Sequence, residues 1–162
     1  MDFMNKGFTL IELLIVASII SMMSILVLPN LRTGEKQFSI VISAHKLAQD
    51  SRKAQEMAMS STEFNGVIPS GGYGINIVNG AKFYILFADL DKDQQYDSNE
   101  KVGDDIYLDG GTVSQTSATI VFTPPDPTIY GVPASIVLSN SLVGGLSTKT
   151  VKINRAGLIS IE

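Results

Sequence analysis

The sequence predicts an α+β protein in which a long N-terminal α-helix packs on a small antiparallel β-sheet or sandwich. Three observations support this prediction: an apolar run near the N-terminus, a helical pattern that resumes directly after it, and short strand-like segments separated by tight turns. The 162 residues suffice for one compact domain and one long element, so a second domain is not expected.

The apolar run covers residues 8–28, and Glu12 is its only ionisable residue. A helix of about 21 residues is roughly 31 Å long, which matches a hydrocarbon core of ~30 Å. A cleaved secretory signal would have a shorter apolar region that ends at a small-residue cleavage site, whereas this run continues well beyond Ala17-Ser18. A plain membrane anchor fits the length but leaves the costly Glu12 carboxylate unexplained.

The helix is predicted to continue to residue 62, which makes residues 29–62 its amphipathic second half. Apolar or small side chains recur there at spacings of three and four residues. Pro29 ends the apolar run, and we expect it to kink or loosen the helix because proline removes a backbone hydrogen bond. The single histidine, His45, is expected to be a partly exposed helix residue and not a ligand.

The segment Lys6-Gly7-Phe8-Thr9-Leu10-Ile11-Glu12-Leu13-Leu14-Ile15-Val16 resembles the cleavage and methylation motif of type IV pilins and type II secretion pseudopilins. The resemblance implies that a prepilin peptidase, which is also the methyltransferase, removes the leader 1–7 by cutting after Gly7. It implies N-methylation of Phe8, and it marks Glu12, together with Pro29, as an assembly residue. In a staggered filament Glu12 can pair with the Phe8 amine of a neighbour; the alternative is that Glu12 only snorkels to the membrane interface.

The same resemblance implies a structural subunit and not an enzyme, with no required cofactor. Its expected partners are the prepilin peptidase/methyltransferase, other pilins or pseudopilins along the N-terminal helix, and an inner-membrane assembly platform. Residues 8–28 would cross the inner membrane once and place the C-terminal domain in the periplasm or at the cell surface before filament entry. The alternative is a membrane-tethered calcium-binding or adhesive module that never assembles. Secretion, pilus and DNA-uptake machines all stay open.

The composition excludes several other classes of protein. There is no cysteine, which excludes disulfides, thiol catalysis and cysteine-based zinc sites. Twelve basic and sixteen acidic residues give a net charge of -4 without a basic stripe, so no direct nucleic-acid contact is expected. With one histidine and no convincing nucleophile motif, an exported enzyme is disfavoured.

Residues 63–162 are predicted to form the β-rich globular domain. Segments 73–78 and 82–88 flank Asn79-Gly80 and predict a hairpin with a two-residue primed turn. Further strands are predicted at 105–108, 118–123, 134–138, 148–153 and 158–161. The proline-rich segment 122–128 is expected to be a stiff, extended surface crossover, with a subunit contact as the alternative.

Within the family, this layout most resembles the minor, H-type pseudopilins and related minor type IV pilins. The resemblance rests on the helix tail 47–58 with Arg52, on Gly72-Tyr73-Gly74, on Phe87-Ala88-Asp89 and on the closing hairpin 151–157. The cysteine pair of many major pilins is missing here, although a cysteine-free major subunit stays open.

An Asp-rich run from Asp89 to Glu100 has the ligand spacing of an EF-hand-type calcium loop. The candidate ligands are Asp89, Asp91, Asp93, Gln95 through its backbone carbonyl, Asp97 and Glu100. Gln94 departs from the pattern, since such loops carry glycine at this position for a sharp turn. The other interpretation is a solvated hairpin loop in which the carboxylates satisfy nearby backbone groups. If calcium binds, it is expected to order the loop.

Overall fold

The computed structural model describes residues 7–126, 128–129, 134–142 and 145–162, with side chains omitted for 26–33, 142, 145 and 146. The chain divides into two compact units, Met1–Glu35 and Lys36–Glu162. Each is described by itself.

One α-helix, α1 (Leu10–Met59), contains 50 residues, which confirms the prediction of a single long helix. The helix continues through position 29, so proline does not end it. The Pro29 side chain lies outside the described residues, and the expected loosening there stays a prediction.

Within the first unit, the large apolar side chains of α1 that the structure describes, in residues 10–25, are exposed. Their exposed fractions run from 47 % at Val16 to 79 % at Leu10, and Phe8 just before the helix is 82 % exposed. Among the side chains that the structure describes, no helix combines the length and the apolarity needed to cross a membrane.

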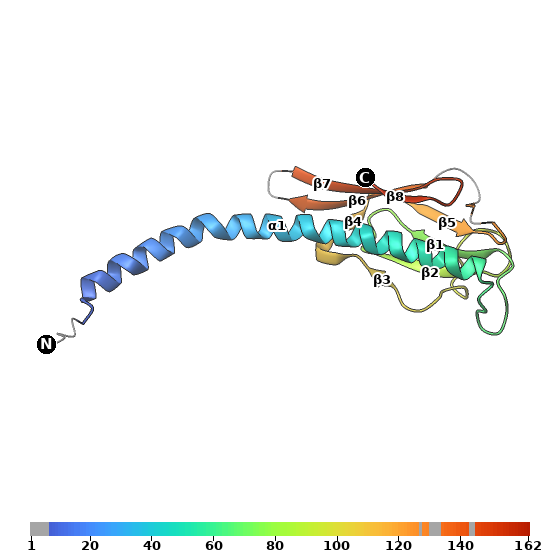
Figure 1. The fold of residues 1–162 in the computed structure, drawn as a ribbon, viewed down its shortest axis with the longest axis horizontal. Helices are drawn as coiled ribbons and strands as arrows, with labels where there is room; N and C mark the ends of the chain where they lie inside the picture. Colours follow the sequence, from blue (N-terminus) through green and yellow to red (C-terminus); the bar gives the residue numbers. More distant parts are fainter. Residues whose placement is uncertain (1–6, 127, 130–133, 143–144) are drawn as a thin grey trace, which may run out of the picture. The chain divides into compact units, whose positions relative to one another are not determined.

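Within the second unit, α1 buries one face of mostly small side chains. Its fully buried apolar residues are Ile40, Ala44, Leu47, Ala48, Ala54 and Ala58. Alanines let the helix axis approach the sheets closely, and their spacings of three and four keep them on one face. This part of α1 runs alongside both sheets (Figure 1).

Two four-stranded antiparallel sheets make up the β-rich part (Figure 1). The first has the order β3-β2-β1-β5, formed by Ile106–Tyr107, Phe83–Asp89, Gly72–Ile77 and Ala118–Phe122. The second has the order β4-β6-β7-β8, formed by Val113–Ser114, Ala134–Leu142, Gly145–Ile153 and Ile159–Ile161. A short 3-10 turn, η1 (Asp109–Gly111), precedes β4. The α+β prediction is confirmed.

Both sheets and the helix share one hydrophobic core. Its largest apolar members include Tyr73, Ile75 and Ile77 of β1, Tyr84 of β2, Phe122 of β5, Ile136 and Leu138 of β6, and Ile153 of β7. Alternate residues of each strand point inward, as the two-residue period of a strand requires. The fold therefore depends on long-range packing between α1 and both sheets.

The predicted primed turn at Asn79-Gly80 is wrong. The amide of Ala81 donates to the carbonyl of Val78 at 3.0 Å, and Gly80 has φ +80° while Asn79 does not have a positive φ. A type I′ turn needs positive φ at both central residues.

That geometry occurs at another Asn-Gly pair. Asn65 and Gly66 have φ +52° and +80°, and Phe64 and Val67 exchange backbone hydrogen bonds of 2.8 and 3.0 Å across them. In the β1–β2 register Ile77 pairs with Tyr84, so Asn79-Gly80 lies in a connection that is longer than the predicted two-residue turn.

Two other strand-level predictions need correction. The segment 122–128 is not extended, because Phe122 forms an antiparallel bridge with Ile129 and the chain therefore reverses between them. Strands β6 and β7 are longer than predicted, since their pairing runs from Ala134 with Ile153 to Leu142 with Gly145. The two-residue strand β4 was not predicted at all.

Candidate functional site

The N-terminal end of α1 carries the candidate processing and assembly residues. Gly7 lies exposed in irregular backbone before the helix, as access for a peptidase requires. Thr9 is the N-cap: the Glu12 backbone amide donates to Thr9 Oγ1 at 3.3 Å. In return, Thr9 donates its amide and its hydroxyl to Glu12 Oε2 at 3.4 and 3.2 Å.

This reciprocal pattern is a capping box, which satisfies amide groups that have no partner inside the helix. The Glu12 carboxylate also lies at the positive end of the helix dipole, where a negative charge is favoured. The sequence signature of this box is Thr9-Leu10-Ile11-Glu12, a Thr followed three residues later by a Glu. Thr9 is therefore a site residue that the sequence prediction missed.

The Asp-rich loop is closed at its base by two buried carboxylates. Asp89 is 0 % exposed and accepts the amides of Lys92 at 2.7 Å and Gln94 at 3.2 Å. Glu100 is 2 % exposed and accepts the amides of Leu90 at 2.8 Å and Asp97 at 3.2 Å. These bonds hold the loop in a compact structure. They match the alternative interpretation of the sequence, in which the carboxylates accept hydrogen bonds from nearby backbone amides.

The calcium-loop residues are only partly gathered. Carboxylate oxygens of Asp89, Asp91 and Asp93 lie within 4.8 Å of one another, while Asp97 and Glu100 are not in this group. Asp91 and Asp93 accept the amides two residues ahead, at 3.1 and 2.7 Å. Calcium binding stays a prediction.

Two further features of the loop bear on that prediction. Gln94, where glycine is usual, has φ +62°, so this position adopts the left-handed conformation that glycine favours. Burial raises the pKa of Asp89; the amides of Lys92 and Gln94 lower it, and the charges of Glu100 and Asp91 raise it further. A cation bound near Asp89 would reduce the repulsion between its carboxylate and those of Glu100 and Asp91.

The motifs Gly72-Tyr73-Gly74 and Phe87-Ala88-Asp89 lie on neighbouring strands. In the β1–β2 register Gly72 pairs with Asp89 and Gly74 pairs with Phe87. A Cβ on Gly74 would lie 2.7 Å from the Phe87 ring and 2.4 Å from the Ile120 carbonyl oxygen, so only glycine leaves room for this packing. The two motifs therefore form one packed unit that carries the Asp-rich loop.

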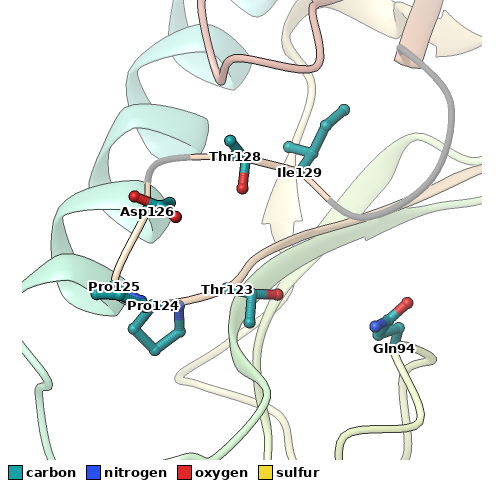
Figure 2. A pocket seen from close by; sticks show the side chains of 7 residues that line it. All are labelled: Gln94, Thr123, Pro124, Pro125, Asp126, Thr128 and Ile129. Carbon is teal, nitrogen blue, oxygen red and sulfur yellow. The ribbon is translucent and has the colours of Figure 1, made fainter.

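A pocket of about 380 Å³ lies beside this loop, at the proline-rich turn (Figure 2). It is lined by Gln94, Thr123, Pro124, Pro125, Asp126, Thr128 and Ile129. Thr123 Oγ1 is buried without a hydrogen-bond partner among the described residues. Pro127 and residues 130–133 lie outside those residues, and the predicted choice between crossover and subunit contact stays open.

Two family models match the chain. Residues 3–28 match the prokaryotic N-terminal methylation motif. Residues 43–157, more than half of the chain, match the type II transport protein GspH. The chain belongs to the GspH family. No curated protein and no solved structure matches it.

Membership of the GspH family confirms the predicted family and the pilin-like fold. This GspH-family protein is a minor pseudopilin or pilin subunit, and the non-assembling alternative is not favoured. Members of the family are structural subunits and not enzymes, and the methylation motif implies processing by prepilin peptidase and assembly with other pilins. Proteins of this type are anchored to a membrane by the N-terminal helix.

Proposed function

We propose that this GspH-family protein is a minor subunit of a type II secretion pseudopilus or a related filament, processed after Gly7 and N-methylated at Phe8. Residues 8–28 would hold it in the inner membrane, with the C-terminal domain outside the cytoplasm, until an assembly platform adds it to the filament. The observation that carries the proposal is the capped start of α1, where exposed apolar side chains and the Glu12 carboxylate follow Gly7 directly.

The chemistry of assembly follows from that arrangement. Cleavage after Gly7 would create an α-amino group on Phe8, four residues before Glu12. In a filament of staggered helices, the ammonium group of one subunit can approach the Glu12 carboxylate of its neighbour. Two opposite charges cost far less together than alone in an apolar core, so this pair would set the register between subunits. Pro29 would then loosen the helix beyond the packed region.

Mass spectrometry of the mature N-terminus tests the processing step. In a host with active prepilin peptidase, we expect the chain to begin at Phe8 and to carry one methyl group on its amine. A Gly7→Ala variant is the comparison, because a side chain at the cleavage point should hinder entry into the protease site. An unmethylated wild-type chain that still begins at Met1 would refute the proposal.

A further inference from the structure

The proline-rich turn that lines the pocket is anchored to the core at its base (Figure 2). Phe122 at the end of β5 forms an antiparallel bridge with Ile129, and both side chains are buried in the hydrophobic core. One residue further along each arm, the Thr123 amide donates to the Thr128 carbonyl at 3.4 Å. The Ile129 amide donates to the Arg155 carbonyl at 3.3 Å, which ties the turn to the closing hairpin. The turn therefore has a fixed position on the domain.

Another wall of the pocket comes from the Asp-rich loop. Gln94 is the loop residue that lines it, and its backbone is held because its amide donates to Asp89 Oδ2 at 3.2 Å. Asp89 pairs with Gly72 in the β1–β2 register. A Cβ on Gly72 would collide with the Phe122 carbonyl oxygen and lie 3.1 Å from Pro124 Cδ. The glycine therefore lets the turn pack on β1 next to the residue that holds the loop.

The polar side chains of the pocket have no partners in the described part of the chain. Thr123 Oγ1 is buried without a hydrogen-bond partner, and its hydroxyl points toward the Gln94 side of the pocket (Figure 2). The side chains of Gln94, Asp126 and Thr128 make no hydrogen bond or ion pair with a described residue either. Two prolines and Ile129 supply the apolar part of the lining. Apolar walls with a few convergent polar groups are typical of binding sites.

The charge of the lining indicates the class of ligand. Asp126 is exposed, is the one ionisable residue among the seven that line the pocket, and forms no ion pair with Arg155 or any other described basic residue. Its carboxylate, the Gln94 amide oxygen and the threonine hydroxyls can all accept hydrogen bonds. A guanidinium group has five N–H donors in a planar fork, and the methylene stem of arginine can lie along apolar surface such as the prolines.

We propose that this pocket binds the side chain of an arginine that a partner protein presents. The guanidinium group pairs with the Asp126 carboxylate and donates hydrogen bonds to Gln94 and Thr123, while the stem lies against the prolines. Arginine is one of the residues that contribute most to binding between proteins. All seven lining residues belong to the second unit, so this contact is independent of the N-terminal helix and of the proposed filament function.

An NMR titration of the full chain in uncharged detergent micelles tests the proposal, with the peptide acetyl-Gly-Arg-Gly-amide as the probe. We expect saturable shifts of the Gln94, Thr123 and Thr128 amides with a Kd on the order of 1 mM, since so small a contact lacks a surrounding interface. Peptides with citrulline, which has no charge, or with lysine, which has no fork, should bind about tenfold more weakly. Equal binding of either peptide, or shifts confined to Asp91 and Asp93 of the acidic loop, would overturn the proposal.

Asp126→Asn is the matched variant, because it keeps the size of the side chain and removes its charge. We expect it to bind the arginine peptide about tenfold more weakly, whereas Asp104→Asn, which changes an exposed acid outside the pocket, should bind as the wild type does. Thr123→Val should weaken binding several-fold without lowering the melting temperature, because the hydroxyl has no partner in the free protein. Wild-type affinity in Asp126→Asn would overturn the proposal.

Discussion

The Glu12 carboxylate has two roles, one as part of the helix cap in its own chain and one, as proposed, in the contact with a neighbouring subunit. Inside the chain, its Oε2 accepts both hydrogen bonds from Thr9. Its Oε1 accepts no hydrogen bond from the residues that the structure describes, which leaves it open to a cation from outside. The cap can therefore persist while the other oxygen meets the Phe8 amine of a neighbouring subunit. The role of Glu12 in assembly was predicted from the motif. The hydrogen bonds of the cap show how its side chain is oriented.

Glu12→Ala should abolish filament assembly while leaving the protein in the membrane fraction. Removal of the carboxylate leaves the neighbour's ammonium group unpaired in an apolar core, which costs about 3–5 kcal/mol. Assembly is measured by recovery in sheared filaments, and insertion by resistance to alkaline extraction. Glu56→Ala is the matched control, since it removes an exposed acid from the same helix. Normal assembly of Glu12→Ala would contradict the pairing.

The Asp-rich loop makes a second prediction at single residues. Asp91 is exposed and lies in the three-carboxylate group, so Asp91→Ala should remove calcium binding without disturbing the buried Asp89 and Glu100. Isothermal titration of the full chain in micelles would measure this. Asp104→Ala, an exposed acid outside the loop, should titrate like the wild type. No heat and no melting shift with calcium in the wild type would leave the loop as a purely structural turn.

At the scale of elements, hydrogen bonds link α1 to the first sheet. Lys46 Nζ on the helix donates to the Tyr107 carbonyl of β3 at 3.2 Å. The hydroxyl of Tyr84, a fully buried residue of β2, donates a hydrogen bond to Asp50 Oδ2 on the helix. Burial, then the hydrogen bond and charge of Asp50, raise the pKa of Tyr84 far above its ordinary value. The hydroxyl therefore stays protonated, and able to donate, at all physiological pH values.

Tyr84→Phe should lower the free energy of unfolding by about 2 kcal/mol, because the hydrogen bond to the Asp50 carboxyl group is lost and no other described residue donates to that group. Urea denaturation followed by circular dichroism measures the change. Tyr107→Phe is the control: this ring is 61 % exposed on β3, and its loss of a hydroxyl should change stability by less than about 0.5 kcal/mol. Equal effects of the two variants would show that the Asp50 contact contributes nothing.

The elements also show where sequence reasoning succeeds. The long helix was predictable because periodicity and the absence of proline between residues 31 and 61 are local signals. The hairpin of β1 and β2 was predicted correctly, but the primed turn predicted at Asn79-Gly80 is absent, and Asn65-Gly66 adopts that geometry instead. An Asn-Gly pair is compatible with more than one turn type, so the dipeptide alone does not determine the turn. The bond between Ser39 and Asn140 spans 101 positions and depends on how β6 lies against α1, so no local pattern could reveal it.

For the whole molecule, apolar side chains occur in two settings, exposed on the first part of α1 and buried in the core of the second unit. The large apolar side chains of residues 8–25 are exposed, which suits packing against lipid or other subunits. The hydrophobic core, by contrast, lies entirely within the second unit, from Ile40 to Ile159. The sequence indicates this division because the apolar run and the strand patterns are separate in the chain. The partners inside the core depend on strand order, which local patterns do not give.

Because the second unit contains its own core, a chain that begins at Lys36 should fold without the first. We expect a soluble monomer with a strand-rich circular dichroism spectrum and one cooperative unfolding transition, as small single domains show. Size-exclusion chromatography and a urea titration test this, with the full chain in micelles as the reference. Removing residues 36–58 as well should abolish cooperative unfolding, because Leu47 and the buried alanines would be lost from both sheets. Aggregation of the chain that begins at Lys36 would instead show that the first unit stabilises the second.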